Sequence, residues 1–291
     1  MLRAAAAVLV ERGLALADDA LHYNVVIPIS DTLLANAYCA NGRFFHIRGS
    51  EAVSLEREFA SHCAAAASLG RFAARPIGRF LRDGWDLLIS EGVAAHPLNA
   101  LRLTRPAKRD NLQNELTKLF TLPSRIVEEP PSRTHRALLD RLDNRFSATE
   151  FAKFAGDPLM RAAPGLLDSI KPRLQHGDFA IENLVWSDAG LHVFDYEDFG
   201  KVSVPGFDLT ILLCSVVRFD TPTIRSWMTE NDDVMRSQFP WLEPCLQAED
   251  LTLQAWKSLI ALHLLAFLWL KDNYARPVRE RVASVLRAIT A

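Results

Sequence analysis

The segment from Leu174 to Asp195 constrains the fold of this chain more than any other part of the sequence. It opens with His176-Gly177-Asp178, and two short apolar runs follow, separated by the turn-forming residues 187–190. Such runs around a turn predict a β-hairpin. We therefore expect Asp178 and Asn183 on the loop that enters the hairpin. Asp195 is expected where the hairpin ends, back near Asn183.

An Asp, an Asn five residues later and an Asp seventeen residues later are the groups that phosphoryl transfer from ATP needs. One carboxylate orients and deprotonates an attacking hydroxyl, while an amide oxygen and a second carboxylate hold Mg²⁺ on the phosphates. Hard oxygen ligands of this kind suit Mg²⁺. The pattern therefore predicts a site for ATP and Mg²⁺.

This segment resembles the catalytic and metal loops of the aminoglycoside phosphotransferase and choline kinase families, small-molecule relatives of the protein kinases. These families carry His-Gly-Asp or His-Asn-Asp where protein kinases carry His-Arg-Asp. The resemblance implies that Asp178 is the catalytic base and that Asn183 and Asp195 are Mg²⁺ ligands. It also implies that His176 braces the loop from within and that Asp208 braces it from the following helix.

The same resemblance implies an α+β, two-lobed protein kinase-like fold. We expect an N-terminal lobe over residues 1–93, with an antiparallel sheet and one main helix. A mostly helical catalytic and substrate-binding lobe is expected over residues 94–291.

Asp198-Phe199-Gly200 spells the metal motif of protein kinases and offers an alternative ligand. Asp195 directly follows the expected strand at Val193-Phe194, where the resembled families place their metal ligand. We therefore favour Asp195 over Asp198.

Composition excludes several classes of protein. The 291 residues are 49% apolar and 23% charged, which is ordinary for a globular protein, and the net charge of −2 gives no case for nucleic-acid or membrane binding. Four widely spaced cysteines indicate reduced thiols and a cytoplasmic protein. Residues 4–10 read as part of an amphipathic helix rather than a signal peptide. The apolar stretch 259–270 reads as a buried helix, too short for a membrane span.

In the N-terminal lobe, strands are expected over residues 23–27, 33–40 and 43–47, the last two joined by the hairpin signal Asn41-Gly42. The resemblance places an ATP-binding cation at the end of the third strand, which here is Arg48. It also implies a glutamate partner on the helix expected over residues 55–69. Glu58 fits that role best, and Glu56 is the alternative.

The first hairpin loop, residues 28–32, lacks the glycines that usually let backbone amides approach phosphate. Hydroxyls of Ser30 and Thr32 could donate instead. A further strand is expected over residues 85–90. By resemblance the connection between lobes follows it, so Ser90, Glu91 and Val93 are expected to line the adenine site.

The C-terminal lobe is expected to contain helices around residues 116–120, 135–145, 150–155 and 209–217. Residues 219–250 combine seven acidic and four aromatic side chains, which would suit a cationic acceptor such as an amino alcohol or an amino sugar. The alternative is that the acids are solvated and the aromatics form core.

The function these features predict is transfer of the γ-phosphate of ATP to a hydroxyl of a small molecule. The alternative is a degenerate kinase fold that binds nucleotide or serves as a scaffold. A protein kinase is a third interpretation, disfavoured because His-Gly-Asp replaces His-Arg-Asp and no Ala-Pro-Glu follows the metal loop.

Overall fold

The computed structural model describes residues 1–16, 22–29, 31–39, 42–93, 95–98, 106–146, 165–229, 232–272 and 276–290, with no account of the side chains of 22–29, 106–110, 132 and 276. The chain divides into two compact units. The first comprises Met1–His96 and Val185–Glu197, and the second comprises Pro97–Leu184 and Asp198–Ala291. The lobe boundary expected after residue 93 stays a prediction.

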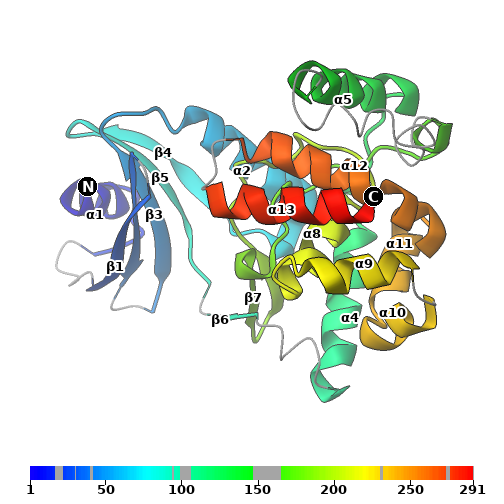
Figure 1. The fold of residues 1–291 in the computed structure, drawn as a ribbon. Helices are drawn as coiled ribbons and strands as arrows, with labels where there is room; N and C mark the ends of the chain where they lie inside the picture. The colour runs from blue at the N-terminus through cyan, green and yellow to red at the C-terminus, as the bar shows by residue number, and fades with distance from the viewer. Residues whose placement is uncertain are drawn as a thin grey trace. The chain divides into compact units, whose positions relative to one another are not determined.

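The first unit is built on a five-stranded antiparallel sheet in the order β1-β2-β3-β5-β4 (Figure 1). Its strands are β1 (His22–Ile29), β2 (Thr32–Tyr38), β3 (Phe44–Ser50), β4 (Pro76–Arg82) and β5 (Trp85–Glu91). Four of the five match strands expected from the sequence. The fourth in chain order, β4, was not expected.

Glycine turns explain how these strands pair. Gly42, which precedes β3, has a φ of +81°, a value that glycine adopts without strain. Asp83 and Gly84 join β4 to β5 with φ values of +51° and +80°, as a type I′ turn requires of both central residues. Asp-Gly is a strong hairpin signal, and it would have revealed β4.

The two faces of this sheet carry different helices (Figure 1). Helix α1 (Leu2–Glu11) packs Ala5 and Leu9 into a buried cluster with β3 and β5, including Ile47 and Ile89. Helix α2 (Glu56–Leu69) lies at the other face of the sheet. Its capping residue Leu55 donates its backbone N–H to the side chain of Asp86 on β5 at 2.9 Å. Side chains alternate between faces along a strand, so each helix covers a separate set of residues.

The hairpin predicted to follow residues 174–183 is present. Strands β7 (Leu184–Ser187) and β8 (Gly190–Val193) pair in a short sheet ordered β6-β7-β8, where β6 is His96–Pro97. Within the first unit, Val193 also forms a parallel bridge with Ala73. Asp195 therefore lies just beyond the strand that the sequence predicted.

The second unit is mostly helical. Its longest helix, α12 (Leu253–Leu270), is buried over most of its length and packs against α8 (Phe207–Val216) and α13 (Arg276–Ile289). Among the described residues it is the one helix long and apolar enough to cross a membrane, yet 72% of it is buried, as in the core helix of a folded domain. The other α-helices among the described residues of this unit are α4 (Pro106–Phe120), α5 (Pro131–Phe146), α9 (Thr221–Thr229), α10 (Asp232–Gln238) and α11 (Leu242–Ala248). The helix expected over residues 150–155 lies outside the described residues.

Candidate active site

The predicted catalytic segment, residues 174–183, is held between two neighbouring stretches of the second unit. The backbone N–H of Leu174 donates to the carbonyl of Arg125 at 2.7 Å. On the other side, Gly200 donates its N–H to the carbonyl of Gln175 at 2.9 Å. The backbone that leads into His176 is therefore fixed before the predicted catalytic residues begin.

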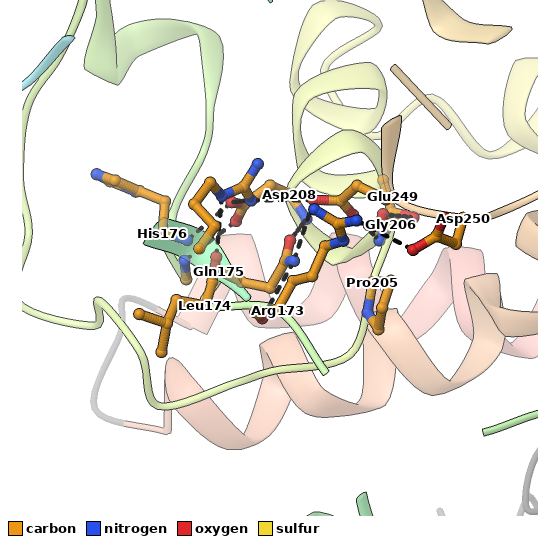
Figure 2. Close-up of polar contacts among 12 residues, drawn as sticks. Arg173, Leu174, Gln175, His176, Pro205, Gly206, Asp208, Glu249 and Asp250 are labelled. Atoms are coloured by element: carbon orange, nitrogen blue, oxygen red, sulfur yellow. Dashed lines mark hydrogen bonds and ion pairs between the residues drawn. The ribbon is translucent and has the colours of Figure 1, made fainter. Parts of the chain in front are cut away.

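A buried network of charged and polar groups lies beneath this backbone (Figure 2). The guanidinium of Arg125, only 1% exposed, donates through Nε to the carbonyl of Leu174 and contacts both Asp208 and Glu249 through Nη2, at 3.2 and 3.1 Å. Gln175 completes the network by accepting the Asp208 N–H and donating to Glu249. Two buried carboxylates thus share one arginine.

Asp208 fastens this network to the catalytic loop. Its carboxylate accepts the backbone N–H groups of His176 at 2.8 Å and of Gly177 at 3.2 Å. Burial raises the pKa of Asp208 to about 7, although Arg125 and the His176 N–H favour the charged form. These contacts fit the role of a brace from the following helix, since Asp208 is the second residue of α8.

Gly177 is required by the path of the loop. Its φ is +88°, and a Cβ built there would lie 2.6 Å from the Cβ and the carbonyl oxygen of Asp198. An arginine in the middle of the triplet, as in protein kinases, would therefore clash with the 198 segment. The next residue, Asp178, is buried, and its N–H donates to Nδ1 of His176 at 3.3 Å.

Asn183 is tied to the same loop. Its side-chain Nδ2 donates to the carbonyl of Asp178 at 2.9 Å. The amide oxygen is then the atom of this side chain with the chemistry of a metal ligand. Asn183 ends a short 3₁₀ turn, Ile181–Asn183, that leads directly into β7.

Asp195 and Asp198 differ in their surroundings. Asp195 has a φ of +65°, a strained conformation for a residue other than glycine and one that clusters at functional sites. Asp198 instead is 3% exposed and contacts two ammonium groups, Lys201 and Lys271, each at 2.6 Å. The structure thus binds the Asp198 carboxylate into an internal ion-pair network. Asp195 lies in the first unit and Asn183 in the second, so their expected proximity stays a prediction.

The donor set fits Mg²⁺. An Asn amide oxygen and an Asp carboxylate are hard ligands. Among the described residues, no group of three or more His, Cys, Asp or Glu side chains could hold a metal ion. That finding is compatible with Mg²⁺, because this ion is usually bound by one or two carboxylates together with waters and substrate phosphates.

In the first unit, the strand cation has its expected partner. Nη1 of Arg48 lies 2.8 Å from Oε1 of Glu58, and Nε of Arg48 donates to the Thr32 hydroxyl at 3.4 Å. Burial raises the pKa of Glu58, while Arg48 opposes that shift. Glu56, the alternative partner, instead lies 3.4 Å from Arg79. Strand β3 continues two residues beyond Arg48, to Ser50, so the cation is not at its end.

The other residues that were expected to contact the nucleotide differ in their surroundings. Ser30 lies outside the described residues. Ser90 is buried on β5, and the N–H groups of Glu91 and Gly92 donate to the carbonyls of Arg75 and Phe44. These two N–H groups are therefore engaged within the unit. Val93, next along the chain, is half-buried.

The acidic residues of 219–250 have internal partners, and the aromatic residues mostly form core. Trp227, Phe239 and Trp241 are buried, and Phe219 stacks on Phe267. Glu230 lies outside the described residues. The remaining acids cap a helix or pair with cations: Asp220 with Thr223, Asp232 with Lys257, Asp233 and Glu243 with Arg236, Glu249 with Arg125, and Asp250 with Arg173.

Three residues at this site were not expected from the sequence: Arg125, Glu249 and Lys271. Arg125 follows a proline between two helices, and Lys271 is the first charge after the apolar stretch 259–270. A cation at the end of a buried helix needs a carboxylate partner. The position of Lys271 after the apolar stretch could therefore have indicated a buried ion pair.

Comparison with known proteins places the chain among phosphotransferases. A model of the phosphotransferase enzyme family matches residues 17–239, well over half of the chain. A search of curated proteins gave no significant match. Solved structures with the same fold include an ethanolamine kinase of Plasmodium vivax, which is 12% identical with a TM-score of 0.57 over 99% of this chain and 87% of that chain.

A choline/ethanolamine kinase family protein of Mesorhizobium loti is 16% identical, with a TM-score of 0.56 over 99% and 92% of the two chains. A thermostable mutant of aminoglycoside phosphotransferase APH(4)-Ia, in a ternary complex with ADP and hygromycin B, is 11% identical, with a TM-score of 0.52 over 98% of both chains. These likenesses confirm the predicted kinase-like fold.

Proposed function

Because the chain belongs to the phosphotransferase enzyme family, we propose that it is a small-molecule kinase that moves the γ-phosphoryl group of ATP to a hydroxyl. The observation that carries this proposal is the construction of the catalytic loop. Asp178 is buried, and its backbone carbonyl accepts a hydrogen bond from the side chain of Asn183. The two residues before it donate their backbone N–H groups to the carboxylate of Asp208. A scaffold would not need this combination of catalytic groups.

In the proposed reaction, the acceptor hydroxyl hydrogen-bonds to the Asp178 carboxylate, which takes its proton as the oxygen attacks the γ-phosphorus. The bond from the acceptor oxygen to phosphorus forms while the bond to the β–γ bridging oxygen breaks. The electron pair of the broken bond leaves with ADP. Asn183 and Asp195 would hold Mg²⁺, which offsets the phosphate charge when bound.

The Arg48–Glu58 pair is proposed to orient the nucleotide. A guanidinium presents several donors to phosphate oxygens, and Glu58 limits the directions in which Arg48 can point. Thr32, the first residue of β2, would contribute its hydroxyl in place of the missing glycines. Adenine is proposed to bind beside Ser90, Glu91 and Val93.

The acceptor is proposed to be a small molecule that carries a hydroxyl. The solved relatives include an ethanolamine kinase and an enzyme bound to hygromycin B, so amino alcohols and aminoglycosides are the first classes to test. The acids of residues 219–250 argue little for a cation, because internal partners already contact the described ones. A cationic acceptor would need carboxylates from elsewhere in the chain.

The test is release of ADP with a panel of choline, ethanolamine, aminoglycosides and neutral sugars. Asp178→Ala and Asp195→Ala should abolish turnover while the circular dichroism spectrum is unchanged. Asp188→Ala, in the exposed turn of the same hairpin, is the control and should retain activity. Near-normal turnover by Asp195→Ala would reject Asp195 as the metal ligand. Mg²⁺-dependent ATP binding without any phosphorylated product would favour the scaffold alternative.

A further inference from the structure

A buried lysine contacts the predicted catalytic base. Lys271 directly follows α12 as its C-terminal capping residue, and its side chain is 2% exposed. Its Nζ lies 3.0 Å from Oδ2 of Asp178 and 2.6 Å from Oδ2 of Asp198. All three residues belong to the second unit, so this contact is internal to one compact body.

The surroundings explain why an ammonium is stable at this buried position. Burial of an unpaired charge is very unfavourable, and Lys271 avoids that cost by contacting two carboxylates. It also lies at the C-terminal end of an 18-residue helix, where the helix dipole favours a positive charge. The backbone N–H of Lys271 donates to the carbonyl of Phe267 at 2.9 Å, so the last turn of α12 fixes its position.

Asp198 serves as the second support of this lysine. It contacts Lys201 as well as Lys271, so two carboxylates and two ammoniums alternate in one network. The backbone of Asp198 is held directly against Gly177, where no Cβ could be accommodated. The residue that anchors Lys271 is therefore itself fixed to the catalytic loop.

We propose that Lys271 is a positioning residue that fixes the orientation of the Asp178 carboxylate for the acceptor hydroxyl. The ammonium holds Oδ2 and so restricts rotation of the carboxylate about its Cβ–Cγ bond. The direction from which a hydroxyl can approach the other oxygen is then set by the fold rather than by the substrate. This inference rests on the proposed function, because it assigns Asp178 the role of base.

The expected size of the effect on kcat follows from the rate lost when a reacting group is misplaced. A shift of about 1 Å in a reacting group can lower the rate by about 100-fold. Lys271→Met keeps the length of the side chain and removes the charge, so we expect kcat to fall by about 10- to 100-fold. The KM for ATP should change little, because Lys271 acts through Asp178. Lys271→Arg retains the positive charge and should recover part of kcat.

Lys257, within α12, provides a matched control. It is a buried lysine on α12 and lies 2.6 Å from a carboxylate of its own, Asp232. Lys257→Met therefore removes a buried charge without touching the catalytic loop and should leave kcat unchanged. An equal fall in kcat for Lys257→Met and Lys271→Met would show that loss of any buried lysine charge in this region lowers kcat, and would overturn the proposal.

A second variant covers the case in which Lys271→Met does not fold. Asp198→Asn combined with Lys271→Met removes the charge of one of the two carboxylates that lose their contact with Lys271, and the fall in kcat should persist in it. A kcat within about threefold of wild type in a folded variant without Lys271 would overturn the inference.

The crystal structure of Lys271→Met, or of the double variant, gives a readout that does not depend on turnover. If the wild-type protein transferred phosphate to no acceptor, the proposed function would be contradicted. The orientation of the Asp178 carboxylate would then decide the inference about Lys271 alone. A carboxylate rotated away from its wild-type orientation supports the role of Lys271. An unchanged orientation refutes it.

Discussion

Removal of the Arg125 guanidinium should destabilise the second unit strongly. Arg125 is buried between Asp208 and Glu249, which are themselves 2% and 0% exposed. Arg125→Met keeps an unbranched apolar side chain but leaves two carboxylates buried without their cation. Breaking a buried ion pair in this way costs about 3 to 5 kcal/mol. That is a large fraction of the total stability of about 5 to 15 kcal/mol expected for a folded domain.

Urea unfolding followed by tryptophan fluorescence is the assay, because Trp241 and Trp256 are buried in the same unit. If uncompensated charge is the cause, Glu249→Gln added to Arg125→Met should recover part of the loss. The deficit should also be smaller at about pH 5 than at about pH 8, because a buried carboxylate without a cation takes up a proton.

Arg236 offers an exposed control with the same arrangement. It too contacts two carboxylates, those of Asp233 and Glu243, but the three side chains are 44%, 76% and 42% exposed. Arg236→Met should therefore change the midpoint of unfolding very little. A loss in Arg125→Met no larger than in Arg236→Met would refute the argument from burial. So would a failure of Glu249→Gln to restore any stability.

Two further outcomes follow from single positions. Gly177→Ala places a Cβ 2.6 Å from Asp198 at a φ of +88°. The substitution should lower the free energy of unfolding by about 2 to 5 kcal/mol and slow phosphoryl transfer at least about tenfold. An active variant with a normal melting temperature would contradict this expectation. Burial lowers the pKa of His263 to about 3, so native His263 is neutral while the unfolded chain binds its proton below about pH 6.5. His263 alone should therefore remove up to about 1.4 kcal/mol of stability per pH unit as pH drops from about 6.5 toward 3. The fall should be less steep in His263→Gln, and equal slopes in urea titrations of the two proteins would contradict the assignment.

Local chemistry made much of the fold predictable. The β7–β8 hairpin follows from two apolar runs around a turn, and the β2–β3 pair follows from the same alternation of strands and turn residues. These signals lie within a few residues of one another, so one sequence contains them in full. β4 was missed although its turn, Asp83-Gly84, carries an equally local signal.

The sequence by itself predicted the proposed catalytic motif, because the offsets from Asp178 to Asn183 and Asp195 lie within one loop and one hairpin. It also identified Arg48 and Glu58, whose pairing depends on a strand and the helix that follows it. Both depend on chain connections of fewer than twenty residues.

Only the tertiary structure decided what holds the motif in place. Arg125, Glu249 and Lys271 come from separate helices and turns, and their charges meet the catalytic segment only after those elements pack. The same packing brings Lys271 to Asp198, and it supplies distant cations for three of the described acids of residues 219–250, namely Asp232, Glu249 and Asp250. A charge in a sequence has no assigned partner, because burial and proximity, which determine its energy, arise from the fold.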